Sequence, residues 1–413
     1  MNADIITIGD ELLIGQVLNT NQAYIAAQLN LIGIPVDRMI TVGDDGDAIV
    51  EAIRASWRPG TICIMTGGLG PTHDDVTKKA ACRFFSCGLA ASAAVRVHIA
   101  ELFAQRNLAW SAAAEEQTMV PERAEIIPNP VGTAPCFYFH DADRRLFVLP
   151  GVPYEMQEIV SRSIIPLLRP LVSGSVIQHR TLRTTGITES MLAQRLGDIE
   201  ALTGRASLAF LPSPTGVRLR ITARETNGDL AARLVQEVEQ RIRVRAGRFI
   251  YGIEDEELEE VLGRILSARR MRIAVAESCT GGLIANRLTN VSGSSTYFDR
   301  GVVTYSNRSK TEVLGITEDL LRNHGAVSRE IAEAMALGIR RVAGTDVGLS
   351  TTGIAGPTGG TEEKPVGLLW IGYADAGGSV ALKFQFGDGR LRFKERASQA
   401  ALELVRRKLL QIE

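Results

Sequence analysis

The stretch AESCTGG, residues 276 to 282, places three nucleophilic side chains in a row. Ser278, Cys279 and Thr280 follow the apolar run RIAV and precede a glycine pair. If a strand turns into a helix here, the N–H groups of Thr280, Gly281 and Gly282 could hold an oxyanion or a phosphate. The same residues would also suit an ordinary helix N-cap. The local pattern leaves both interpretations open.

A serine nucleophile needs a general base, and the sequence offers few candidates. Of the five histidines, His324 alone lies near these motifs. The segment YSNRSK supplies Tyr305 and Lys310 at the end of another strand-like run. A lysine can accept a proton only when it is neutral, which requires burial or a neighbouring positive charge. Cys279 is the rival nucleophile, but adjacent strand residues point to opposite faces, so only one of them can meet a substrate. We favour Ser278.

Three acidic, glycine-rich loops occupy the first part of the chain: GDELLIG (9–15), VGDDGD (42–47) and TGGLGPTHDD (66–75). Glycines let backbone N–H groups approach a phosphate, and carboxylates can hold Mg²⁺. The loops therefore suit a nucleotide pyrophosphate with a bridging metal ion. Neither a P-loop nor a GxGxxG fingerprint is present. The carboxylates of these loops are therefore candidates for the metal, and their glycines are candidates for the substrate.

The elements that must position these residues fall into three regions. In region 1–170, the runs DIITIG, TICIMTGG and RLFVLPG each end in glycine, which predicts βα units in a mostly parallel sheet. Such sheets bind ligands at the carboxyl ends of their strands. Region 171–252 predicts a small α+β module. It is rich in arginine, with 13 Arg, no Lys and 7 acidic residues between positions 169 and 248, a local charge of +6.

Region 253–413 predicts a separate α/β domain. The segment DEELEEVLGRILSARR has apolar residues at helical spacing, an acidic first turn and a basic last turn. Strand-like runs follow at RIAVAES, GVVTYSN, DVGLSTTGIAG, LLWIGYA and ALKFQF, with helical stretches at EIAEAMALGIRRV and RFKERASQAALELVRRKLL.

Composition excludes several classes of protein. The net charge of −1 is not the positive charge that is typical of nucleic-acid-binding proteins. No apolar stretch approaches the roughly 20 residues that span a bilayer. The N-terminus lacks a signal-peptide pattern, and five scattered cysteines favour reduced thiols. We therefore expect a cytoplasmic protein without a membrane partner.

The longer motifs resemble a known family. GDELLIGQVLNTN, TGGLGPTHDDVTKKA, NPVGTAP and LPGVPYEM resemble the first domain of the CinA family, which is related to molybdopterin-binding domains. AESCTGGLIA, GVVTYSNRSK, GAVS and GIAGPTGGTEEKPVG resemble its C-terminal domain, nicotinamide mononucleotide deamidase. The resemblance implies a molybdopterin-binding-like α/β domain (1–170), a KH-like α+β module (171–252), a separate α/β deamidase domain (253–413), and a homodimer. One departure is Cys136, where the family pattern has glycine.

The resemblance also implies two hydrolytic activities. The first domain would hydrolyse ADP-ribose with Mg²⁺ or Co²⁺. The residues carried over to this site are Asp75, Asp74, Asp44, Asp10 and Glu11 for the metal, and Gly67, Gly68 and Gly70 for the substrate. The last domain would deamidate nicotinamide mononucleotide without a cofactor, through a dyad of Ser278 and Lys310. Further residues that match the family near the substrate are Tyr305, Thr352, Gly353 and Arg390.

Two alternative functions stay open at this point. The arginine-rich, KH-like module suggests a competence-associated, nucleic-acid-binding adaptor. It has no GxxG loop and few aromatic residues for base stacking, so we expect no nucleic-acid partner. The first domain could instead bind molybdopterin. We favour pyridine-nucleotide hydrolysis, because both implied substrates are breakdown products of NAD.

Overall fold

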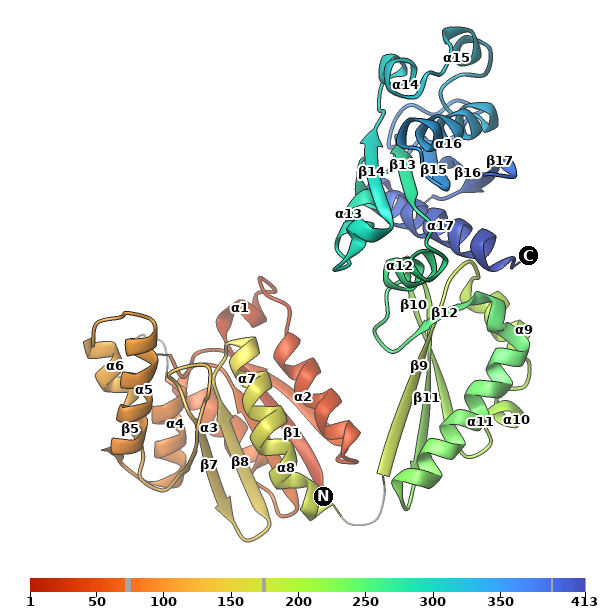
Figure 1. Ribbon diagram of the computed structural model, residues 1–413. Helices are drawn as coiled ribbons and strands as arrows, with labels where there is room; N and C mark the ends of the chain where they lie inside the picture. Colours follow the sequence, from red (N-terminus) through yellow and green to blue (C-terminus); the bar gives the residue numbers. More distant parts are fainter. Residues whose placement is uncertain (71–75, 173–175, 388, 413) are drawn as a thin grey trace. The chain divides into compact units, whose positions relative to one another are not determined.

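The structure is a computed structural model that describes residues 1–70, 76–172, 176–387 and 389–412. The chain divides into two compact units (Figure 1). The first comprises Met1–Gln178 with Arg224–Ala232, and the second comprises His179–Ala223 with Arg233–Glu413.

The first unit contains a six-stranded sheet and a separate strand pair. Its strands are β1 (Asn2–Ile8), β2 (Val36–Val42), β3 (Thr61–Thr66), β4 (Leu89–Ala91), β5 (Met119–Pro121), β6 (Glu125–Ile127), β7 (Cys136–Asp141) and β8 (Arg144–Leu149). The sheet order is β2-β1-β3-β8-β7-β6, in which the first four strands pair in parallel and β7 pairs antiparallel with both β8 and β6. The predicted mostly parallel sheet is confirmed.

Helices cover both faces of this sheet. They are α1 (Asp10–Leu13), α2 (Thr20–Leu31), α3 (Gly46–Ser56), α4 (Thr77–Phe85), α5 (Ala93–Gln105), α6 (Ala112–Gln117), α7 (Pro153–Ile159), α8 (Ile165–Leu168), the π-helical η1 (Val160–Ile164) and the 3₁₀ turn η2 (Arg169–Leu171). Because strand side chains alternate, Ile5 packs in the core with α2 and α7, whereas Ile6 packs in the core with α3, α4 and α5. Figure 1 shows α2, α7 and α8 along one face.

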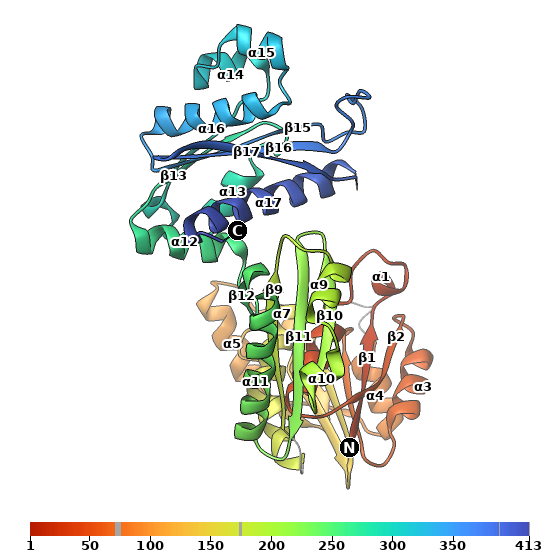
Figure 2. The ribbon, with the colours of Figure 1, turned by 90° about the vertical axis from the view of Figure 1, so that its right-hand side faces the viewer.

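The middle module is the predicted α+β element. Its strands are β9 (Val176–Thr184), β10 (Ser207–Ser213), β11 (Gly216–Glu225) and β12 (Ile250–Ile253), and its helices are α9 (Glu189–Leu196), α10 (Ile199–Thr203), α11 (Gly228–Ala246) and η3 (Gly247–Phe249). The sheet order is β10-β11-β9-β12. Along β11, Val217, Leu219 and Ile221 are buried while Arg218 and Arg220 are exposed. The helices lie together on one face of this sheet (Figure 2).

The last region of the chain is a second α/β sandwich. Its strands are β13 (Ile273–Glu277), β14 (Phe298–Val303), β15 (Val347–Gly353), β16 (Leu368–Asp375) and β17 (Gly378–Gln385). Its helices are α12 (Leu258–Arg269), α13 (Leu283–Thr289), η4 (Ser294–Thr296), α14 (Asn307–Leu314), α15 (Glu318–His324), α16 (Arg329–Ala343) and α17 (Arg390–Leu410). One face packs against α16 and the other against α12, α13 and α17 (Figure 2). None of the helices in the described ranges is long and apolar enough to cross a membrane.

The strand order β14-β13-β15-β16-β17 determines where a site can form. Strand β13 pairs in parallel with both β14 and β15, while β16 and β17 are antiparallel. The carboxyl ends of the three parallel strands therefore meet at one edge. The segments that leave this edge are AESCTGG after β13, TYSNRSK after β14 and GIAGP after β15.

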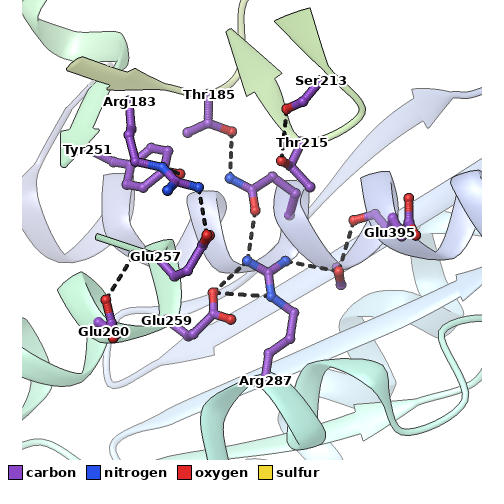
Figure 3. Close-up of polar contacts among 12 residues, drawn as sticks. Arg183, Thr185, Ser213, Thr215, Tyr251, Glu257, Glu259, Glu260, Arg287 and Glu395 are labelled. Carbon is purple, nitrogen blue, oxygen red and sulfur yellow. Dashed lines mark hydrogen bonds and ion pairs between the residues drawn. The ribbon is translucent and has the colours of Figure 1, made fainter. Parts of the chain in front are cut away.

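Buried polar contacts fix the helix that follows AESCTGG. Arg287 of α13 donates to Glu259 of α12 (2.6 Å) and to Ser398 (3.0 Å) and Gln399 (2.8 Å) of α17 (Figure 3). Gln399 in turn donates to the hydroxyl of Thr185 in the middle module (3.2 Å). Helix α13 is thus anchored to two neighbouring helices and, through Gln399, to the middle module.

Candidate functional site

The structure brings Ser278 and Lys310 together. Lys310 Nζ lies 3.3 Å from Ser278 Oγ, and it also lies 2.7 Å from the carbonyl oxygen of Thr304 and 3.4 Å from that of Tyr305. The lysine is 1% exposed, and burial lowers its pKa below the ordinary value of 10.5. Its three partners are uncharged. A lysine in these surroundings is biased toward the neutral form that can accept a proton.

Glu277, the last residue of β13, holds the turn that carries the serine. The glutamate is 1% exposed, and its carboxylate accepts N–H groups from Gly282 (3.0 Å), Ile284 (3.1 Å) and Ala285 (2.9 Å). No motif assigned a role to this residue. A carboxylate at the end of a predicted strand, six residues ahead of the helix that begins at Leu283, is the signal that could have found it, because such a group can cap unpaired amides.

The backbone donors expected between residues 280 and 282 are only partly available. Gly282 N–H donates to Glu277, and Gly281 N–H donates to the carbonyl of Ser278 (3.2 Å). The prediction that both amides face a substrate is therefore wrong, since the turn itself uses them. In the described part of the chain the Thr280 N–H has no acceptor. The Thr280 hydroxyl is fully buried and pairs with Thr351 (2.7 Å).

Cys279 lies on the opposite side of the turn from Ser278, as the strand alternation predicts. It is buried in the apolar core that includes Phe393, and burial raises the pKa of its thiol to about 12. A thiol in this environment stays protonated at neutral pH and is a poor nucleophile. Ser278, in contrast, is partly exposed.

The other predicted residues of this site divide into two groups. Arg390 donates to the hydroxyl of Tyr305 (3.0 Å) and to the carbonyl of Gly356 (3.0 Å), so the two side chains meet beside the dyad's helix α14. Thr352 is 1% exposed, and its hydroxyl donates to the carbonyl oxygen of Ala326 (2.7 Å). This hydroxyl therefore stabilises the GAVS loop, residues 325–328, instead of facing a substrate. A Cβ on Gly353 would lie 2.6 Å from a backbone oxygen, so this glycine permits close strand packing.

The first unit has a pocket of about 320 Å³ at the carboxyl ends of its parallel strands. Gly67, Gly68, Asp44 and Glu11 line it, which agrees with the prediction that the glycine loops share a crevice. Gly67 has φ +116°, and a Cβ there would lie 2.2 Å from the carbonyl oxygen of Ile8, so only glycine fits. Asp10 and Gly70 are exposed and do not line the pocket.

The carboxylates of this pocket do not form a metal site by themselves. Asp44 accepts the backbone N–H of Asp10 (3.0 Å), and Asp10 accepts that of Asp44 (3.2 Å). Among the described residues, no three side chains of ligating type come together. Asp74 and Asp75 lie outside the described residues. Asp10, Glu11 and Asp44 alone therefore do not fit the divalent ion that the resemblance implies.

Comparison with known proteins assigns the whole chain. Three family models match: probable molybdopterin binding domain over residues 4–170, damage-inducible protein CinA KH domain over 179–252, and CinA C-terminal domain over 255–409. A CinA-like protein from Salinibacter ruber is 46% identical over 99% of this chain and 100% of its own length. The chain belongs to the CinA family.

A second full-length relative agrees with this assignment. A CinA-like protein from Chloroherpeton thalassium is 45% identical over 98% of this chain and 99% of its own. Among solved structures, the competence/damage inducible protein CihA from Agrobacterium tumefaciens is 38% identical, and the match covers 38% of this chain and 98% of that one with a TM-score of 0.36.

A larger cavity of this CinA-family protein carries no dyad residue. It measures about 1030 Å³ and lies between α17, β17 and the middle module, with apolar walls that include Phe384 and Met191. Neither Ser278 nor Lys310 lines it. We place the candidate chemistry at the dyad, because cavity size alone supplies neither a nucleophile nor a base.

Proposed function

We propose that the C-terminal region of this CinA-family protein deamidates nicotinamide mononucleotide to nicotinic acid mononucleotide and ammonia. The observation that carries the proposal is the buried lysine with lowered pKa, whose Nζ lies 3.3 Å from the hydroxyl of Ser278. The family's Ser–Lys amidase pattern matches the same two positions.

The geometry suggests how the proton moves. A neutral Lys310 can donate its two N–H bonds to the carbonyls of Thr304 and Tyr305, which leaves its lone pair for the Ser278 hydroxyl proton. As Lys310 takes that proton, Ser278 Oγ attacks the carboxamide carbon. The free N–H of Thr280 is the donor in the turn that could stabilise the resulting oxyanion.

The remaining steps return the enzyme to its starting state. The protonated Lys310 gives its proton to the departing nitrogen, so that ammonia leaves and an ester to Ser278 remains. Water then attacks this ester, Lys310 takes a proton from the water, and the acid product is released when Ser278 recovers its hydrogen.

The test measures ammonia release from nicotinamide mononucleotide by the wild type, Ser278→Ala and Cys279→Ala. We expect the first variant to lose activity and the second, which alters the neighbouring buried thiol, to retain it. The proposal is wrong if the wild type releases no ammonia, or if Ser278→Ala is active while Cys279→Ala is not.

A second activity, hydrolysis of ADP-ribose to AMP and ribose 5-phosphate, is supported by the pocket of the first unit. Four glycines, Gly9, Gly67, Gly68 and Gly151, line this pocket, and glycine backbone can approach a pyrophosphate closely. Metal dependence follows only from the resemblance and rests on Asp74 and Asp75.

The second test compares ADP-ribose turnover by the wild type and Asp75→Asn, with Mg²⁺, with Co²⁺ and with a chelator. Asp47→Asn is a matched control, because Asp47 is exposed and pairs with Arg83 on the surface. Undiminished turnover by Asp75→Asn would overturn the assignment of that carboxylate, and full activity with the chelator would overturn the metal requirement.

A further inference from the structure

Lys394 of α17 lies beside the turn that carries the nucleophile, although no sequence motif pointed to it. A Cβ built on Gly281 would lie 3.4 Å from the Nζ of Lys394. Gly281 is exposed and has φ +60°, and because even a Cβ there would contact the ammonium group, Lys394 lies directly against the turn. Lys394 is half-buried.

The charge of Lys394 is not balanced by the protein. Within the described ranges it forms no ion pair and no hydrogen bond through its ammonium group. A half-buried ammonium without a counter-ion has lost part of its hydration without gaining an anionic partner. Such a group points to an anion supplied from outside the chain.

Arg390 lies one helical turn before Lys394 and contributes a second cation. Residues four apart on a helix share one face. Within the part of the chain that the structure describes, the guanidinium of Arg390 donates to the uncharged Tyr305 hydroxyl and Gly356 carbonyl, both at 3.0 Å, and pairs with no carboxylate. The nearby carboxylate of Glu277 is engaged with three backbone amides. Among the described residues, neither of these two cations at the start of α17 has an acidic partner.

We propose that Lys394, supported by Arg390, is the anion subsite that takes the 5′-phosphate of the substrate and selects mononucleotides over nucleosides. This inference rests on the proposed deamidase function. The phosphate is remote from the carboxamide and does not change during the reaction. Its binding should therefore lower KM and leave kcat nearly unchanged.

The experiment compares nicotinamide mononucleotide with nicotinamide riboside, which lacks the phosphate. The variants are Lys394→Met, Lys394→Arg and, as a matched control on the same helix, the exposed Lys408→Met. Loss of one charge-assisted contact is expected to raise KM for the mononucleotide ~10–100-fold in Lys394→Met, which corresponds to about 1.4–2.7 kcal/mol. Turnover of the riboside should not change, the arginine variant should stay close to wild type, and Lys408→Met should match wild type.

Inorganic phosphate supplies an independent measurement. It should compete with the mononucleotide in the wild type and in Lys408→Met, and should compete far more weakly in Lys394→Met. The subsite would be overturned if Lys394→Met lost the same fraction of kcat/KM on the mononucleotide and on the riboside, or if its KM for the mononucleotide were unchanged. If the wild type releases no ammonia at all, the deamidase proposal fails. Direct binding of phosphate to the wild type and Lys394→Met then decides the subsite separately.

Discussion

The two glycine-rich candidate sites of this protein differ in how far their charged side chains are exposed to solvent. At the AESCTGG turn, Lys310 and Glu277 are each 1% exposed, and both side chains are held by hydrogen bonds within the protein. In the first unit, Asp10 and Glu11 are exposed and Asp44 is half-buried at an open pocket. Proton transfer from a serine requires a desolvated base, whereas a pyrophosphate site must admit a highly charged, hydrated ligand.

The largest effect that separates the two sites is expected for Lys310→Met. Without its general base, deamidation of nicotinamide mononucleotide should fall by ~10²–10⁴-fold. ADP-ribose hydrolysis in the first unit should be unchanged, since Lys310 contributes nothing to that pocket. Steady-state rates for both substrates check this, with circular dichroism to confirm folding. A parallel fall in both activities would mean that the two sites are not independent.

The pH dependence of the two activities should also differ. Burial lowers the pKa of Lys310, and the neutral amine is the active form, so deamidation should rise with pH up to a pKa below 10.5. Below that pKa, kcat/KM should fall about tenfold for each pH unit. The acidic limb should disappear from residual activity in Lys310→Met. A flat profile from pH 6 to 10 in the wild type would argue against a lysine base.

A smaller effect is expected for Glu277→Gln, which tests whether the turn must be rigid. A glutamine has only one acceptor oxygen for the three amides, so at least one buried N–H should lose its partner, at a cost of ~1–3 kcal/mol. If about 1.4 kcal/mol of this cost is added to the activation free energy, kcat falls ~10-fold.

The readouts for Glu277→Gln are kcat, KM and Tm together. We expect lower kcat and Tm with nearly unchanged KM, while Glu277→Asp recovers part of both losses. A variant with wild-type kcat would show that the turn does not depend on this cap.

Much of this architecture could be predicted from the sequence. The run RIAV before a glycine pair indicated a strand that turns into a helix, and β13 and α13 lie there. The helix predicted from residue 255 is α12, which begins at Leu258. Local patterns suffice here because apolar spacing and glycine act over a few residues.

The contacts that define the sites could not be predicted in this way. Arg390 and Tyr305 are 85 residues apart, and Gly281 and Lys394 meet only because α17 packs beneath the sheet. Thr352 matched the family motif, yet its hydroxyl is used by the GAVS loop. Which amides remain free in a turn depends on its backbone angles, which is why the expected donors Gly281 and Gly282 were wrong.

The smallest effect is expected for Asp44→Asn in the first unit. Asparagine keeps an oxygen that can accept the Asp10 N–H, so the loop should hold its shape and only the negative charge is lost. A charge-assisted hydrogen bond exceeds a neutral one by about 1 kcal/mol, which predicts a ~5-fold loss of ADP-ribose hydrolysis. Deamidation should not change, and Asp47→Asn should match wild type. If Asp44→Asn instead abolishes ADP-ribose hydrolysis, the charge of Asp44 acts directly on the substrate or on its counter-ion. The first site would then depend on a single side chain as strongly as the Ser278–Lys310 dyad does.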